Sequence, residues 1–107
     1  WAVEPENAAI LSGGAIGTHL QMGIGDGLIP DNLNQDIYDD LYLVTDEEAI
    51  QTAKDLARLE GLMCGISSGT NVAAALKLAK KLGAGKTVVT ILPDTAERYF
   101  STPLFQE

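Results

Sequence analysis

The sequence is poor in several residue types, and each shortage excludes a class of protein. Cys64 is the only cysteine among 107 residues, so a disulfide framework and a cysteine-based metal site are both excluded. We therefore expect no metal site and a reducing, cytoplasmic setting. No apolar run approaches the roughly 20 residues of a membrane-spanning helix, so we expect no membrane insertion.

Positive charge is also scarce. Seven lysines and arginines stand against fifteen aspartates and glutamates, which gives a net charge of −8. No basic cluster is larger than Lys80-Lys81. Because nucleic-acid binding depends on concentrated positive charge, we expect no nucleic-acid partner. The length and a hydrophobic content of 46% are typical of one small soluble globular domain.

The first residues predict a short strand over residues 1–4, closed by Glu4-Pro5 because proline cannot continue a sheet ladder. The chain starts at Trp1 without an initiating methionine, inside this strand. Natural domains seldom open in the middle of a strand. We therefore expect the C-terminal portion of a longer polypeptide.

A glycine-dense region follows and extends to Pro30. Its apolar residues fit neither a helical nor a strand period, which predicts an ordered loop. Gly23-Ile24-Gly25-Asp26-Gly27 lacks the preceding strand, the following helix and the spacing of a dinucleotide fingerprint, so we do not assign one. The acidic stretch 31–40 predicts a solvated surface.

Two helices and three strands are expected after this loop. Leu41–Val44 predicts a strand, and Thr45 with Glu48 forms the capping box of an amphipathic helix over residues 46–60. A second helix over residues 68–82 is apolar around most of its first half, which predicts burial. Leu62–Cys64 predicts a short strand, and the β-branched run Thr87–Leu92 predicts a central strand covered on both faces.

This order of elements predicts an α/β fold, in which a parallel sheet has flanking helices. Ligands of such sheets bind beyond the carboxyl ends of the strands, which here means Gly65–Gly69 and Pro93–Thr95. The stretch Gly65-Ile66-Ser67-Ser68-Gly69-Thr70-Asn71 starts the second helix and offers hydroxyls and free N–H groups to a polar or anionic ligand. An ordinary N-cap explains the same residues.

Three segments taken together resemble cysteine synthase (O-acetylserine sulfhydrylase), a pyridoxal-phosphate (PLP) enzyme of the tryptophan-synthase-like fold. Their order and spacing match over nearly all of the chain. They are Val3–Pro5 with the downstream Gly23–Pro30, then Glu60–Gly69, then Ile91–Thr102.

The resemblance implies that residues 1–107 are the C-terminal segment of the PLP-binding domain, part of the large domain of a PLP fold type II enzyme. It implies PLP as the cofactor and a β-replacement in which O-acetylserine and sulfide give L-cysteine. It also implies a cytoplasmic homodimer when full length, and serine acetyltransferase as a partner of some members.

The resemblance further assigns roles to individual residues. Ser67 is expected to face the pyridine nitrogen of the cofactor, and the turn at Pro93 and Asp94 is expected near the cofactor ring. Gly23 and Gly25 are expected to line the substrate side of the pocket. A turn that needs glycine explains Gly23 and Gly25 equally well, and turns that end strands are common.

No catalytic residue is expected in this segment, because the family's Schiff-base lysine belongs to an earlier part of the chain. None of the lysines present lies in a matching motif, so we expect the 107 residues alone to be inactive. Cys64 is expected to be a small buried residue, and His19 has no assigned catalytic role. Departures from the family pattern occur at Thr18, Gln21-Met22 and Ala96. They lie near the rim of the expected pocket, so they bear on substrate preference more than on fold.

Three hypotheses remain open. The first is the C-terminal part of a cysteine synthase. The second is a related β-replacing PLP enzyme, such as one resembling cystathionine β-synthase. The third is a non-catalytic fragment or interaction module that binds no cofactor.

Overall fold

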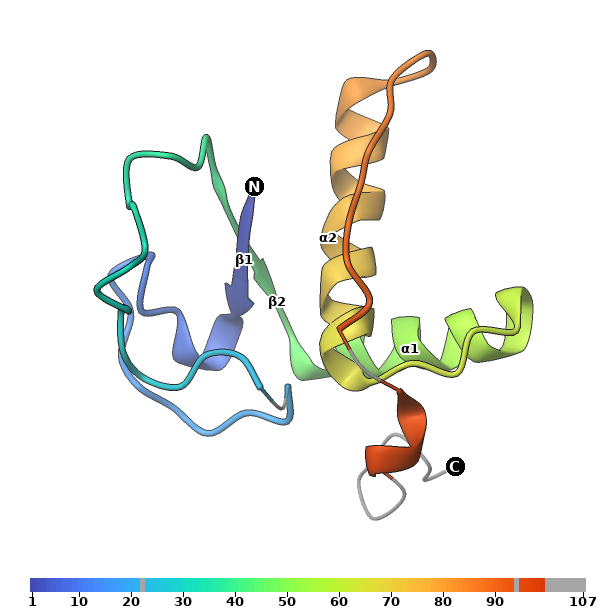
Figure 1. Cartoon of the computed structure of the whole chain (residues 1–107), viewed down its shortest axis with the longest axis horizontal. Coiled ribbons are helices and arrows are strands. Elements are labelled where there is room, and N and C mark those ends of the chain that lie inside the picture. Colours follow the sequence, from blue (N-terminus) through green and yellow to red (C-terminus); the bar gives the residue numbers. More distant parts are fainter. Residues whose placement is uncertain (22, 94, 100–107) are drawn as a thin grey trace.

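The computed structural model describes residues 1–21, 23–93 and 95–99. Strands β1 (Ala2–Pro5) and β2 (Leu41–Val44) pair in parallel, with Ala2 opposite Leu41 and Pro5 opposite Val44. The long segment between the strands lies on one side of them, and helices α1 (Asp46–Glu60) and α2 (Ile66–Leu82) lie on the other (Figure 1). Two short 3-10 helices, η1 (Glu6–Ala8) and η2 (Ala96–Tyr99), complete the described elements. The predicted α/β architecture with parallel pairing is confirmed.

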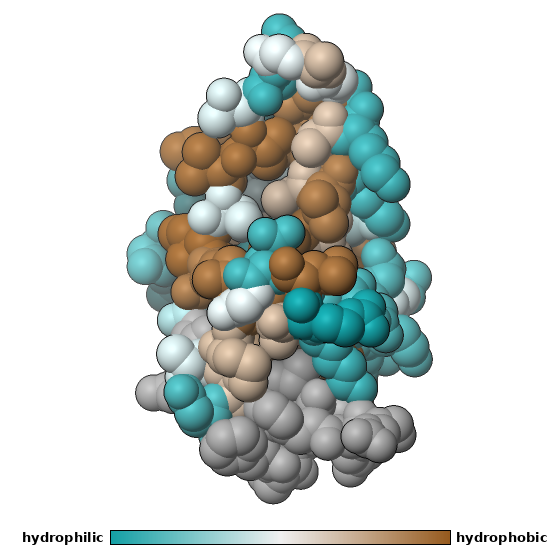
Figure 2. All heavy atoms as spheres, turned by 90° about the vertical axis from the view of Figure 1, so that its right-hand side faces the viewer, coloured by the Kyte–Doolittle hydropathy of each residue, from teal (hydrophilic) through white to brown (hydrophobic). Residues whose placement is uncertain are grey.

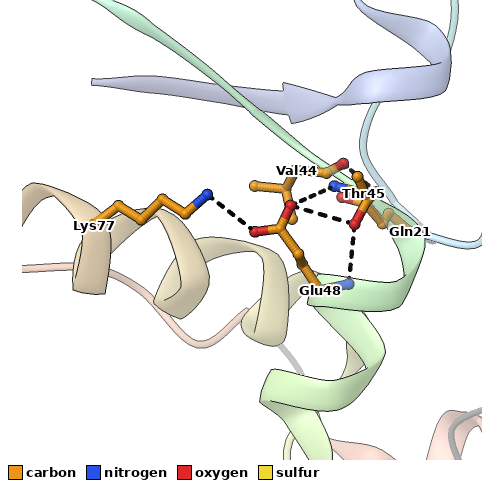
Figure 3. Close-up of polar contacts among 5 residues, drawn as sticks. All are labelled: Gln21, Val44, Thr45, Glu48 and Lys77. Atoms are coloured by element: carbon orange, nitrogen blue, oxygen red, sulfur yellow. Dashed lines mark hydrogen bonds and ion pairs between the residues drawn. The ribbon is translucent and has the colours of Figure 1, made fainter.

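Helix α1 begins with the predicted capping box. The Glu48 backbone N–H donates to Thr45 Oγ1 at 3.1 Å, and the Thr45 N–H donates to Glu48 Oε1 at 3.4 Å (Figure 3). The helix ends at Gly61, whose φ of 71° is the left-handed conformation that glycine adopts at low cost. Both ends therefore lie where the sequence predicts them, because each is decided by residues within one turn.

Helix α2 packs closely against α1 through small residues. A Cβ atom on Gly69 would overlap the Ala49 carbonyl oxygen and lie 2.9 Å from the Ala53 nitrogen, so only glycine permits this approach. Val44 and Ile66 are completely buried beside this contact and form the centre of the core. Neither helix of the described residues has the length and apolar character needed to cross a bilayer.

The boundaries and burial of α2 differ in part from the prediction. The helix starts at Ile66, two residues before the predicted start, and its last buried residue is Ala74. From Leu76 onward the helix is largely exposed, and Leu76 itself is 56% exposed. Other elements therefore cover α2 only along its first half.

The prediction of a central strand over Thr87–Leu92 is wrong for the described structure. This segment contains no strand, and Val89 and Ile91 are 85% and 70% exposed. A central strand needs a hydrogen-bonded neighbour on each edge, whereas β1 and β2 pair with each other. The predicted strand at Leu62–Cys64 is likewise reduced to one antiparallel bridge between Cys64 and Thr95.

The segment after α2 therefore leaves apolar side chains in solvent. Figure 2 shows these side chains gathered over α2 and the segment that follows it. Contiguous apolar surface of this kind marks contact sites or promotes aggregation. The large exposed apolar residues of the two helices, their connection and this segment are Leu59, Leu62, Met63, Leu76, Leu82, Val89, Ile91 and Leu92.

Candidate cofactor and substrate site

The first turn of α2 is buried and has no side-chain cap. Gly65 occupies the N-cap position with extended backbone (φ −75°, ψ 176°) and has no side chain to accept a hydrogen bond from the first turn. Both serines lie inside the helix, so the interpretation of this stretch as an ordinary serine N-cap is wrong. N–H groups of the first turn lack partners within a helix, and the helix dipole makes this end electropositive. The geometry suits a polar or anionic ligand group.

The two serines of this turn are both almost inaccessible to solvent. Ser67 is 4% exposed and Ser68 is completely buried. The Ser68 Oγ atom has no hydrogen-bond partner among the described residues. A buried hydroxyl without a partner costs about 1–3 kcal/mol, so this atom indicates a polar neighbour that the described residues do not provide.

The two segments expected at the carboxyl ends of strands lie next to each other. Thr95 bridges Cys64, and the Ala96 N–H donates to the Met63 carbonyl oxygen at 3.1 Å. Pro93 is exposed at this junction, and Asp94 lies outside the described residues. A direct contact of Pro93 or Asp94 with a cofactor stays a prediction.

The glycine loop contains two positions whose backbone requires glycine. Gly23 and Gly25 have φ values of 88° and 61°, in the left-handed region. At Gly25 a Cβ atom would also lie 2.8 Å from Pro5 Cγ and 3.0 Å from His19 Nε2. Gly23 has open space around the position of a Cβ atom. The turn interpretation therefore accounts for both glycines, and the pocket role of each stays a prediction.

A cavity of about 260 Å³ separates this loop from β1. The loop side consists of residues 23–28, and the opposite side includes Val3, Glu4 and Ala8. A space of this size holds several water molecules. The space therefore suits a small metabolite.

Glu4 is buried in the wall of this cavity, and its carboxylate is fully engaged. Its oxygens accept hydrogen bonds from the Leu11 N–H at 2.9 Å, the Ser12 N–H at 3.0 Å and the Ser12 hydroxyl at 2.7 Å. Glu4 is 5% exposed. These contacts give Glu4 a role in holding the start of the long loop against β1.

Gln21 joins the loop to both helices. Nothing in the sequence marks it as a site residue. Its side chain is completely buried. Gln21 Nε2 donates to the Val44 carbonyl oxygen at 2.9 Å and to Asp46 Oδ1 at 3.0 Å, and Gln21 Oε1 accepts from Thr70 Oγ1 at 2.8 Å. Figure 3 shows Gln21 beside Val44 at the start of α1. In the sequence Gln21 is only a departure from the family pattern, because its partners are distant along the chain.

His19 and Cys64 have structural environments. His19 Nδ1 accepts the Gln21 N–H at 3.0 Å, so His19 Nε2 carries the proton and donates to the Gly25 carbonyl oxygen at 3.1 Å. Cys64 is 6% exposed, as predicted for a small buried residue. Within residues 1–21, 23–93 and 95–99, no group of three or more His, Cys, Asp and Glu side chains gathers around a common point.

Lys77 is the lysine whose electrostatic environment is most clearly defined. Its Nζ atom lies 3.4 Å from Glu48 Oε2 and 4.8 Å from the centre of the Tyr42 ring. Tyr42 is the largest cause that raises the pKa of Lys77. Desolvation opposes this rise, and Glu48 adds to it.

Comparison with known proteins shows the relationship of this chain. Residues 1–94 match the family model described as pyridoxal-phosphate dependent enzyme. Cysteine synthase of Staphylococcus aureus (strain Mu50 / ATCC 700699) is 49% identical over 104 residues, which cover 97% of this chain and 34% of the relative. The chain thus spans about a third of the length of the curated relatives it matches.

Solved structures agree with the sequence comparison. The cysteine synthase of Entamoeba histolytica superposes with a TM-score of 0.95 at 42% identity, over 99% of this chain and 32% of that one. O-ureido-L-serine synthase superposes with a TM-score of 0.93 at 40% identity, over 97% of this chain and 33% of that one. The chain is therefore homologous to cysteine synthase and belongs to the family of pyridoxal-phosphate-dependent enzymes.

Proposed function

We propose that residues 1–107 are the C-terminal segment of the PLP-binding domain of a cysteine synthase. The whole protein would make L-cysteine from O-acetylserine and sulfide by replacing the β-substituent. The observation that carries this proposal is the sequence identity to the Staphylococcus aureus cysteine synthase over nearly the whole chain. Since the chain spans about a third of that relative, the activity belongs to the longer protein.

The first turn of α2 fits a cofactor with polar edges. The Ser68 hydroxyl is buried without a partner, and the helix N-terminus has no side-chain cap. In this proposal Ser67 holds the ring nitrogen of PLP, and Pro93 and Asp94 form the turn beside the ring. When bound, PLP withdraws electrons from the amino-acid substrate and so allows its β-substituent to leave. Ser67 presents a neutral hydroxyl at the electropositive end of α2, where a protonated ring nitrogen is disfavoured.

The glycine loop forms the substrate side of the site in this proposal. Gly23 and Gly25 border the cavity between the loop and β1, and no side chain projects from either residue. The backbone can therefore approach the carboxylate or β-substituent of a small amino acid closely. The engaged carboxylate of Glu4 supports the wall of the cavity and leaves the proton transfers to groups elsewhere in the whole protein.

The remaining properties of the whole protein follow by resemblance. We propose a cytoplasmic homodimer, with serine acetyltransferase as a protein partner. The exposed apolar residues of α2 and of the segment after it support contact with further polypeptide.

A related β-replacing enzyme is the second candidate. The structural match to O-ureido-L-serine synthase, a protein named for a different β-substituted product, supports an acceptor other than sulfide for this candidate. A cystathionine β-synthase-like enzyme would use homocysteine in place of sulfide. A non-catalytic fragment that binds no cofactor is the third candidate.

One experiment separates the three candidates. The full protein that carries this sequence is reduced with borohydride, digested and analysed by mass spectrometry for a phosphopyridoxyl-lysine, and is then assayed with O-acetylserine and either sulfide or homocysteine. An adduct together with cysteine formation supports the first candidate. An adduct with preference for homocysteine or another acceptor supports the second, and absence of the adduct and of all activity supports the third.

A further inference from the structure

We propose that Gln21 is a positioning residue that sets the distance between the glycine loop and the first turn of α2. The inference rests on the proposed function, in which the loop faces the substrate and the turn faces the cofactor. Gln21 touches neither of them. It acts through the backbone of the loop and through Thr70.

The Gln21 amide is satisfied by three different elements. Its two N–H groups reach the end of β2 at Val44 and the start of α1 at Asp46, and its oxygen accepts from Thr70 on α2. The side chain is completely buried. An amide has two donors and one carbonyl oxygen, so each of these groups has a partner and the amide has a single favourable orientation.

The loop side of this contact is short and stiff. The Gln21 backbone N–H is bound by His19 Nδ1, and the His19 ring also reaches the Gly25 carbonyl oxygen. The Ile24 N–H donates to the Gln21 carbonyl oxygen at 3.4 Å. A displacement of the Gln21 side chain is therefore transmitted to Gly23 and Gly25 within a few residues.

The helix side of the contact is equally close to the candidate cofactor site. Thr70 Oγ1 lies 2.8 Å from Gln21 Oε1 and 3.3 Å from the Ile66 carbonyl oxygen. Ile66 and Thr70 enclose Ser67 and Ser68 within one helical turn. Gln21 thus connects the two walls of the proposed site through one buried side chain.

Removal of the amide should affect substrate binding more than cofactor binding. Gln21→Leu has a similar size but removes the hydrogen bonds to the Val44 oxygen and Asp46, and it leaves Thr70 with the Ile66 carbonyl oxygen alone. The loop then loses its fixed position, while the backbone of the first turn of α2 remains in place. We expect the KM for O-acetylserine to rise about tenfold and the PLP content to stay unchanged, since one buried polar partner is lost.

The test compares Gln21→Leu, Thr70→Val, Thr70→Ser and the double variant Gln21→Leu/Thr70→Val in the full PLP-loaded protein. Gln51→Leu is the matched control, because Gln51 is an exposed glutamine on α1 that bonds Asp55. Three quantities are measured: the kcat and KM for O-acetylserine, the PLP absorbance, and hydrogen–deuterium exchange of the amides in residues 19–25.

The proposal requires a higher KM and exchange about tenfold faster at residues 19–25 in Gln21→Leu and Thr70→Val. The double variant should add little to either single one, and Thr70→Ser should restore normal behaviour because it keeps the hydroxyl. Unchanged exchange at residues 19–25, or additive effects in the double variant, would overturn the proposal. If Gln21→Leu fails to fold, the comparison of Thr70→Val with Thr70→Ser decides the question.

The exchange measurement also separates this inference from the proposed function. If the unaltered protein shows no activity with O-acetylserine, the proposed function fails. Coupled exchange effects at Gln21 and Thr70 would then still support the link between loop and helix, whereas independent effects would overturn it.

Discussion

Asn71 Nδ2 donates a hydrogen bond to the Ile91 carbonyl oxygen at 2.9 Å. This bond holds the extended segment after α2 against the helix, on the face that Asn71 shares with Ser67 one turn earlier. The bridge between Cys64 and Thr95 holds the same segment a few residues later. Two contacts thus keep the Pro93 turn close to the start of α2 although this segment forms no sheet.

Replacement of Asn71 by leucine should release this segment. The variant loses one exposed side-chain hydrogen bond, which contributes about 0.5–1.5 kcal/mol, so global stability should fall only slightly. Backbone amides of residues 88–93 should exchange with deuterium more rapidly. Asn32→Leu, at an exposed position in the long loop, is the control, and equal exchange in the two variants would contradict the role of the bond.

Substitution of Gly69 by alanine should strongly destabilise the packing of α2 on α1. The added Cβ atom would overlap the Ala49 carbonyl oxygen, a backbone atom that cannot move without displacing α1. We expect a loss of about 1–3 kcal/mol in the free energy of unfolding, as for overpacked cores. Urea denaturation measures this loss. Lys80→Ala, on the exposed part of α2, should change the free energy by less than about 0.5 kcal/mol.

The pair of Lys77 and Glu48 should contribute stability that disappears at alkaline pH. Tyr42 and Glu48 raise the pKa of Lys77 above its usual 10.5. Because the pKa of Lys77 is higher in the folded than in the unfolded state, the protonated side chain stabilises the folded state at pH values below the unfolded-state pKa. This contribution is lost as the pH rises through the folded-state pKa. The stability difference between the unaltered chain and Lys77→Met should therefore be present at pH 8 and vanish in strongly alkaline solution above pH 10.5. A difference that persists unchanged there would show that Lys77 acts through packing alone.

Charge placed on the exposed apolar segment should reduce self-association of the 107-residue polypeptide. Val89 and Ile91 are 85% and 70% exposed, so Val89→Lys/Ile91→Lys removes apolar surface without opening a cavity in the core. Sedimentation velocity should show a smaller aggregated fraction than for the unaltered polypeptide. Thr87→Lys/Lys86→Ala, which adds no net charge at neighbouring exposed positions, is the control and should leave association unchanged.

Replacement of Ser67 by alanine tests the proposed cofactor contact in the full protein. Loss of one hydroxyl partner at the ring nitrogen should lower kcat about tenfold and shift the cofactor absorbance. Thr87→Val removes a hydroxyl at an exposed position outside the proposed site and serves as the mutational control. Unaltered kcat and absorbance in Ser67→Ala would remove Ser67 from the proposed site.

Interactions between residues close together in the sequence determine much of the fold, and α1 is the clearest example. The Thr45 and Glu48 capping box and the Gly61 stop act within one turn, so the bounds of that helix follow from the sequence. The parallel arrangement of strands and the small residues that let α2 approach its neighbours also follow from pattern, whereas the pairing of β1 with β2 comes from the structure. The family resemblance came from three motifs and agrees with the comparisons.

The tertiary structure alone decided the properties that depend on distant partners. Gln21 became a link between loop and helices only because folding brings Thr70 and Asp46 to it. The β-branched run after α2 lies outside the sheet of the described residues, in which β1 and β2 pair only with each other. Intrinsic preference specifies what a segment favours, whereas the hydrogen-bond partners available in space determine what it forms.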